Sequence, residues 1–333
     1  MRICIRSAWE EPFYVDKKSF DFKQFLLKYV FEILVVVMAV VLCFTTKGFA
    51  SFKNIIGILR SMAMIGVLAF GIMTVIICGE IDLSAVSTVA MTGVVIGKLC
   101  NAMPDNHVAA VLLGTLIMVG VACAVGSLNS YLVLRFHFPA FIATMAVNFA
   151  TFGITATISN GFPVIGFPDW YNVIGGGTLF GVVPVPAIIL IVIYVVTNFI
   201  LNNTKMGRAV FAVGGNMQSA RLSGINVPKV KRFSFIYVQL MAVLSGIMVS
   251  SQVMSGSYSF ANGWDFQAIS CVIIGGTSFT GGAGRVWGTL VGLFFYGMVN
   301  NAMTLLNVSQ FIQYIIRGLI ILLAVIINSY RKD

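Results

Sequence analysis

The sequence predicts an all-α membrane protein that crosses the bilayer about ten times, because its apolar runs are long enough for helices of about 20 residues. Hydrophobic residues make up 59% of the 333 residues and charged residues only 10%. In an ordinary globular domain about a quarter of the residues are charged. Composition and run length therefore both indicate a multi-spanning membrane protein.

The expected spans follow one another from residue 29 to residue 328. They cover 29–46, 55–78, 83–102, 108–134, 139–158, 183–202, 233–254, 266–279, 287–306 and 311–328. The second span ends at Gly79, and the eighth is short and continues into glycines. Both ends are expected to be broken or re-entrant, which membrane depth permits only where protein or water satisfies the backbone. The alternative is that they are ordinary connecting turns.

The distribution of Lys and Arg predicts the orientation, because cytoplasmic loops carry an excess of both. With the N-terminus inside, sixteen of the 21 Lys and Arg residues lie on the cytoplasmic side. The segment 159–182 contains no Lys or Arg, as expected of an external loop. Both termini are therefore expected in the cytoplasm, together with the 131–138 turn, the 203–232 loop and the 280–286 turn.

The two ends of the chain are expected to lie outside the bilayer. Residues 1–28 combine charges with six aromatic residues, which indicates an amphipathic helix on the inner leaflet or else a disordered tail. The first apolar run is long enough to span, so it is an uncleaved anchor and not a signal peptide. Residues 29–328 then form one transmembrane domain, and residues 329–333 form a cytoplasmic tail.

The sequence contains no pattern for catalysis or metal binding. The two histidines, His107 and His137, lie far apart, and the six cysteines form no C-x-x-C pair. The chain also lacks G-x-x-x-x-G-K-[ST], the loop that cradles ATP phosphates. Residues 281–284 lack the lysine of such a loop, so tight turning and close helix packing explain their glycines better. The net charge of +10 is spread between apolar runs and does not indicate nucleic-acid binding.

Three blocks of sequence carry a resemblance to a known family. Residues 69–84 read AFGIMTVIICGEIDLS, residues 207–226 contain GR, VGGN and LSGIN, and residues 272–285 read VIIGGTSFTGGAGR. With PAFIAT at 139–144, the chain resembles the permease subunits of sugar-importing ABC transporters of the ribose, galactose and autoinducer-2 type. The resemblance extends from about residue 50 to the C-terminus, and the order and spacing of the blocks make it specific.

The chain departs from the family pattern beside the expected transport path. Glu80 stands where the family usually has a second glycine, and residues 83–87 and 265–270 differ from the usual LSVGS and ELDAIA. The cargo therefore need not be one of the common sugars. Glu80 and Asp82 could alternatively be interfacial carboxylates with no part in transport.

The resemblance implies a multi-pass transport subunit of the bacterial cytoplasmic membrane that is not itself an enzyme. No cofactor is expected in this chain, because ATP and Mg²⁺ would be bound by two cytosolic ABC ATPase subunits or one fused ATPase. The other implied partners are a second permease copy or a paralogue, an extracytoplasmic solute-binding protein and the lipid bilayer.

The loop 203–232 is expected to couple the permease to the ATPase. Arg208 and Arg221 would pair with acidic groups, Gly214-Gly215 would break the backbone direction, and Leu222 and Ile225 would enter an apolar pocket. The residues expected to take part are Gly207, Arg208, Gly214, Gly215, Asn216, Ala220, Arg221, Gly224 and Ile225. The alternative is a solvated loop whose charges only obey the positive-inside rule.

A sugar crossing the membrane needs hydrogen-bonding groups at weak, repeated sites. The candidates along the path are Asp82, Asn129, Thr144, Asn148, Gln267, Asn300 and Asn301. Each could equally make a hydrogen bond between helices. The alternative cargo is a branched-chain amino acid or another small polar solute. An ion-coupled secondary transporter fits less well, because it needs ionisable residues in mid-span and this chain has almost none.

Overall fold

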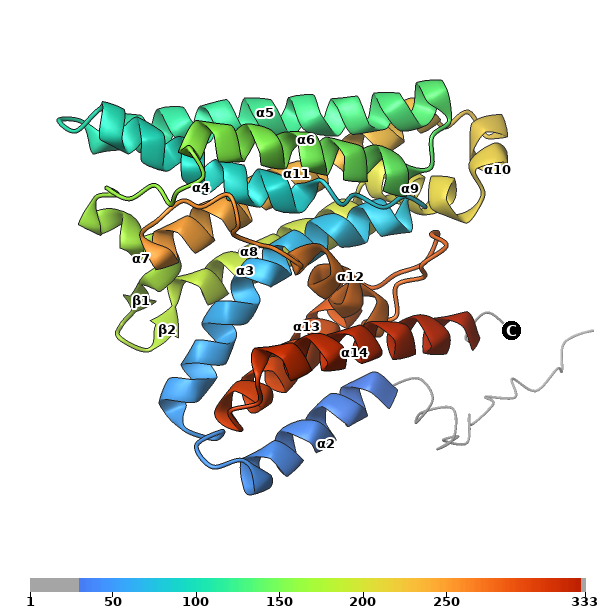
Figure 1. The fold of residues 1–333 in the computed structure, drawn as a ribbon. Helices are drawn as coiled ribbons and strands as arrows, with labels where there is room; N and C mark the ends of the chain where they lie inside the picture. Colours follow the sequence, from blue (N-terminus) through green and yellow to red (C-terminus); the bar gives the residue numbers. More distant parts are fainter. Residues whose placement is uncertain (1–29, 331–333) are drawn as a thin grey trace, which may run out of the picture.

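The computed structural model describes residues 30–330, and these residues form an almost wholly helical bundle (Figure 1). They contain thirteen α-helices, one short 3-10 helix and one two-stranded hairpin. The prediction of an all-α membrane protein is confirmed. The expected amphipathic segment 1–28 and residues 331–333 of the expected tail lie outside the described residues.

Ten of the helices coincide with the ten expected spans. They are α2 (Val30–Thr45), α3 (Phe52–Ile77), α4 (Ala85–Ala102), α5 (His107–Phe136), α6 (Ala140–Ser159), α8 (Val185–Asn203), α11 (Val227–Val253), α12 (Trp264–Ile274), α13 (Val286–Leu305) and α14 (Gln310–Tyr330). Among the described residues, six helices are long and apolar enough to cross a membrane, namely α3, α4, α5, α6, α8 and α11. The number of crossings therefore stays a prediction.

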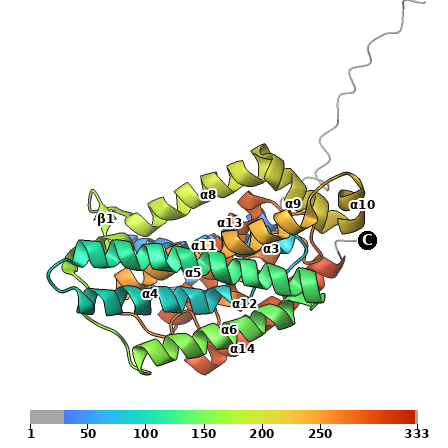
Figure 2. The ribbon, with the colours of Figure 1, turned by 90° about the horizontal axis from the view of Figure 1, so that it is seen from above.

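The shorter elements lie at the two ends of the bundle. One end, at the right of Figure 1, holds α9 (Lys205–Gly215), α10 (Met217–Leu222), the turn between α5 and α6, and the C-terminal end of α14. The opposite end holds α7 (Asn172–Gly176), the strands β1 (Thr178–Leu179) and β2 (Val183–Pro184), and the turn between α4 and α5 (Figures 1 and 2). The 3-10 helix η1 (Asp169–Tyr171) directly precedes α7. Segments that the charge pattern assigned to one side of the membrane thus share one end of the fold.

Several helices begin at polar residues that cap their first turn. Ser51, Asn106 and Asn226 each accept a hydrogen bond from a backbone N–H three residues further on. Such caps satisfy donors that the helix itself leaves unpaired. In α11 the cap is followed by Pro228 in the first turn, where the missing N–H costs nothing.

Helix α11 forms the centre of the bundle and packs against α3, α4 and α5. Close approach is possible because small residues lie at the crossings, as is common between helices in membranes. A Cβ at Gly126 of α5 would lie 2.7 Å from the Cα of Ile236, and a Cβ at Gly71 of α3 would lie 2.9 Å from the Cα of Val238. Helices α5 and α11 are also long, with 30 and 27 residues.

Two helix ends are interrupted inside the protein. Helix α3 ends at Ile77 and α4 begins at Ala85, so residues 78–84 are non-helical although Asp82, Leu83 and Ser84 are buried. Helix α12 has only 11 residues and ends at Ile274, five residues before the expected end of its span. Both helices thus end next to the glycines that the sequence indicated. Whether these ends are broken helices at membrane depth or ordinary connecting turns depends on their position in the membrane, so the expectation stays a prediction.

Candidate coupling and translocation sites

The end of α9 meets both interrupted segments at a cluster of five glycines, Gly79, Gly214, Gly215, Gly281 and Gly282, which we name the glycine junction. The N–H of Gly282 donates to the carbonyl oxygen of Ile77 at 2.9 Å. A Cβ at Gly214 would overlap the same oxygen, and a Cβ at Gly281 would lie 2.8 Å from the Cα of Gly79. Three segments far apart in the sequence therefore touch backbone to backbone.

The structure corrects the expected role of Gly214-Gly215. Both residues belong to α9, neither has a positive φ, and the chain changes direction at Asn216, whose φ is −155°. Asn216 also caps α10, because its Oδ1 accepts from the N–H of Ser219 at 2.8 Å. Gly214 therefore allows α9 to approach the backbone of the neighbouring segments closely, and it does not turn the chain. By contrast, Gly281 and Gly282 have φ of 86° and 75°, so the tight turn and close packing expected there are both confirmed.

The expected coupling residues divide into an exposed group and a buried group. Arg208, Gly215, Asn216, Arg221 and Gly224 are exposed at the end of the bundle. Gly207 and Ala220 are buried, while Gly214 and Ile225 are half-buried. The half-buried Ile225 packs against the core of this chain, so it does not project outward as expected.

The surface formed by α9 and α10 also exposes large apolar side chains. Leu222 is 84% exposed and Met217 is 51% exposed. They lie on the same short helix as Arg221. Apolar groups beside cations at an exposed end suit a partner that offers acidic groups around an apolar pocket.

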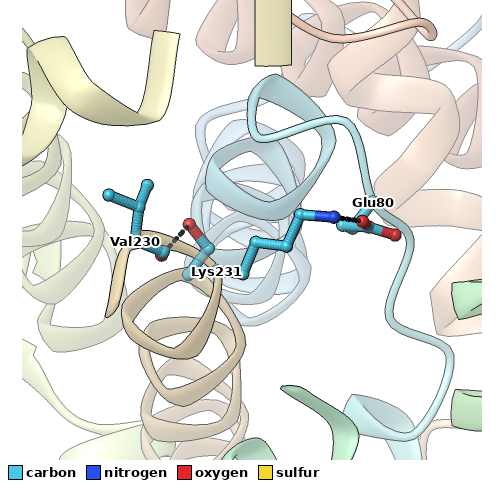
Figure 3. A network of polar contacts seen from close by, with 4 residues as sticks. Glu80, Val230 and Lys231 are labelled. Atoms are coloured by element: carbon cyan, nitrogen blue, oxygen red, sulfur yellow. Dashed lines mark hydrogen bonds and ion pairs between the residues drawn. The ribbon is translucent and has the colours of Figure 1, made fainter. Parts of the chain in front are cut away.

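A buried ion pair joins the connection 78–84 to the first turns of α11. Lys231 of α11 donates to a carboxylate oxygen of Glu80 (Figure 3). The side chains of Glu80 and Lys231 are only 12% and 10% exposed. The sequence alone allows two roles for Glu80. The structure shows that its carboxylate pairs with Lys231. The sequence gives no separate signal for Lys231, because it is one of several cations in the loop 203–232.

Asp82 organises a buried polar cluster. Its Oδ1 accepts from the backbone N–H and the Oγ of Ser84 at 2.8 and 2.6 Å. Its Oδ2 accepts from the side-chain amides of Gln239 at 2.9 Å and Asn129 at 3.3 Å. Gln239 in turn accepts from Thr88 at 2.6 Å. These bonds connect the start of α4 with α5 and α11, and they satisfy the carboxylate without any cation.

Three of the expected path residues belong to this buried region. Thr144 accepts from the N–H of Leu83 at 3.1 Å, next to Asp82 and Asn129. Thr144, Asp82 and Asn129 are at most 1% exposed, so none of them lines an open passage in this conformation. Ser84 and Gln239 complete the cluster. A single sequence carries no signal for such pairings between distant segments.

Asn300 and Asn301 line a hollow of about 270 Å³ between α3 and α13, with Ser61, Tyr296 and Thr304 also on its wall. Asn301 exchanges two hydrogen bonds with Asn54, at 2.9 and 2.7 Å. Asn300 accepts from the Nε of Arg317 at 3.2 Å. The two asparagines therefore tie α13 to α3 and α14 while bordering the hollow.

Asn148 and Gln267 lie apart from the Asp82 cluster. Asn148 of α6 lines a smaller hollow that is closed by the segment 254–263. Gln267 is buried in the first turn of α12, where that segment ends. Among residues 30–330, no group of three or more His, Cys, Asp or Glu side chains is arranged to hold a metal ion. What the described residues offer in this region is a set of polar side chains on the walls of small hollows.

Comparison with known proteins gives matches over most of the chain. The family described as the permease component of branched-chain amino acid transport systems matches residues 54–325. The ribose import permease protein RbsC of Haemophilus influenzae is 34% identical over 322 residues, covering 95% of this chain and 97% of the relative. The L-arabinose ABC transporter permease protein AraH of Azospirillum brasilense is 37% identical over 297 residues, covering 89% and 86%. The probable ABC transporter permease protein YphD of Escherichia coli is 36% identical over 322 residues, covering 93% of each chain. No solved structure matches the chain.

Proposed function

Because the chain belongs to the family of permease components of binding-protein-dependent import systems, we propose that it forms the path for a sugar or sugar-like solute in an ABC importer. The observation that carries the proposal is similarity along nearly the entire chain to permeases named for ribose and L-arabinose. The chain is a multi-pass inner-membrane protein, and its family consists of transport subunits and not of enzymes.

The energy for import comes, in this proposal, from a separate ATPase that docks on α9 and α10. Arg208 and Arg221 pair with acidic groups of the ATPase, and Leu222 and Met217 enter an apolar pocket between them. ATP binding and hydrolysis move the docked helices. The glycine junction passes that movement to residues 78–84 and 276–285, because its backbones touch without intervening side chains.

The solute path runs beside the interrupted helices in this proposal, and a binding protein delivers the solute at the opposite end. Non-helical backbone inside a membrane protein commonly lines such a path. Asn148 and Gln267 contact the solute, whereas Asp82, Asn129 and Thr144 hold the surrounding helices in register. Asn300 and Asn301 border a second hollow whose size suits a monosaccharide.

Transport should depend on all three kinds of subunit. The tagged chain, purified with its associated ATPase and reconstituted with the binding protein, should take up ribose or L-arabinose only when ATP is supplied. The chain alone should hydrolyse no ATP, because it lacks a phosphate-binding loop. ATP-driven uptake of leucine without uptake of pentoses would favour the branched-chain amino acid alternative. Uptake by the chain alone, driven by an ion gradient, would refute the ABC assignment.

The end of the bundle that holds α9 and α10 should face the cytoplasm, and the chain should cross the membrane ten times. In a background without native cysteines, a membrane-impermeant maleimide should label Asp169→Cys in intact cells and leave Ser219→Cys unlabelled. Both positions are exposed in the structure, and the cells express the chain without its ATPase, so access depends on the membrane side alone. Permeabilised cells provide the control, because both variants should then react. Labelling of Ser219→Cys in intact cells would reverse the orientation.

A further inference from the structure

A small hollow lies between the start of α4, the middle of α6 and the segment 254–263. Its polar lining consists of Ser87, Asn148, Tyr258 and Asn262, and Phe152 supplies an apolar wall. The Oδ1 of Asn148 is buried and has no hydrogen-bond partner within the described part of the chain. A buried acceptor is normally paired. The Oδ1 of Asn148 can therefore accept a hydrogen bond from a donor group that enters the hollow.

The lining has the chemistry that recognises a sugar. Its two amides and two hydroxyl groups can form hydrogen bonds with the hydroxyl groups of a ligand. The rings of Phe152 and Tyr258 stand 5.4 Å apart at 78° and present apolar surface to its C–H face. No lining residue carries a charge. A neutral polyhydroxylated solute therefore fits better than an amino acid, whose two charges would need charged partners or helix ends.

The segment that closes the hollow is held in a strained backbone conformation. Met254 and Ala261 have φ of 52° and 63°, in the left-handed region that non-glycine residues rarely adopt, and Gly263 follows with φ of 76°. Ala261 itself lines the hollow. Strain of this kind is retained where it serves a function such as a clamp or switch.

The closed hollow is too small for a sugar. Its volume is about 20 Å³, which is room for roughly one water molecule. A sugar can reach Asn148 only after Tyr258 and Asn262 move away with the segment 254–263. That segment leads directly into α12, whose other end continues into the glycine junction. Opening of the hollow is therefore mechanically connected to the end that docks the ATPase.

We propose that Ser87, Asn148, Tyr258 and Asn262 form a contact site for a neutral polyhydroxylated solute during its passage, with the segment 254–263 as the gate over it. The site rests on the proposed function, because it assumes that a sugar passes through this chain. Asn148 supplies the acceptor, and the aromatic pair supplies the stacking surface.

The test uses the reconstituted complex of permease, ATPase and binding protein. Asn148→Leu and Asn262→Leu should each reduce the maximal rate of pentose uptake about three- to tenfold, the effect of losing one or two neutral hydrogen bonds. Each should also change the ratio of ribose to 2-deoxyribose uptake, which a purely structural defect would leave constant. Stimulation of the ATPase by the loaded binding protein should remain.

The matched control is Phe149→Leu, which changes the adjacent residue of α6, whose side chain is 65% exposed and does not line the hollow. It should transport like the wild type. If the wild-type complex transports pentoses and the two asparagine variants keep its rate and its ribose to 2-deoxyribose ratio, the contact site is refuted while the proposed function stands. A parallel loss of uptake and ATPase stimulation at a constant ratio also refutes it. A wild-type complex that transports no sugar overturns the proposed function and this site together.

Discussion

Replacing Gly214 with alanine should abolish ATP-driven transport. A Cβ at this position would overlap the carbonyl oxygen of Ile77 and would lie 2.8 Å from the backbone nitrogen of Gly282. Both obstacles are backbone atoms, so no rotamer change relieves them. Overpacking typically costs about 1–3 kcal/mol, and here α9 must move away from both interrupted segments. The measurement is uptake in the reconstituted complex, beside the amount of permease in the membrane and the amount of bound ATPase.

Gly215 provides a matched control for Gly214 one residue away. A Cβ at Gly215 meets only the Cα of Gly282, at 3.8 Å, which is an ordinary contact. Gly215→Ala should therefore transport at nearly the wild-type rate. If Gly214→Ala also transports normally, the contact between α9 and the interrupted segments is not needed for coupling, and the proposed transmission through the glycine junction is wrong.

Breaking the ion pair between Glu80 and Lys231 should strongly destabilise the protein. Either Glu80→Gln or Lys231→Met leaves the other charge nearly buried without a partner, since the side chains are only 12% and 10% exposed. Removing one partner of a buried pair typically costs about 3–5 kcal/mol. Both variants should therefore melt at clearly lower temperature in detergent and accumulate less in the membrane.

The double variant Glu80→Gln with Lys231→Met separates charge from shape. Since it leaves no unpaired charge, it should recover most of the lost stability, because replacing a whole buried pair is often neutral. Because each single change costs about 3–5 kcal/mol and the double change is nearly neutral, the coupling energy in the double-mutant cycle should be at least about 3 kcal/mol. Additive effects of the two single changes would show that the ion pair contributes no interaction of its own.

The sequence predicted the helices well because apolar runs report burial in lipid directly. It predicted their ends less well. The expected span 233–254 starts six residues after the true start of α11 at Val227, because Lys229, Lys231 and Arg232 lower the hydropathy without breaking the helix. Asn226 and Pro228 carry the true start signal. Helix α12 ends earlier than expected because Gly275 and Gly276 follow its last residue, Ile274, and Gly276 has a φ of 85°.

The candidate site was predictable only as far as local patterns reach. The loop 203–232 stands out by charge and glycines, and it does lie at an exposed end of the bundle. The pairings of Glu80 with Lys231 and of Asp82 with Gln239 join residues more than 150 positions apart. No composition or spacing reveals them. Gly214 shows the same limit, because a close approach between helices looks like a turn signal in sequence.

The lengths of α5 and α11 have a consequence for the membrane in which the protein works. With 30 and 27 residues, they are about 45 and 40 Å long at 1.5 Å per residue, whereas the hydrocarbon core is about 30 Å thick. Both helices must therefore tilt or extend beyond the hydrocarbon core. Hydrophobic mismatch then acts on the same helices that carry the coupling end. The thickness of the bilayer, which its acyl chains set, should therefore affect the tilt of the bundle and how readily the protein changes conformation.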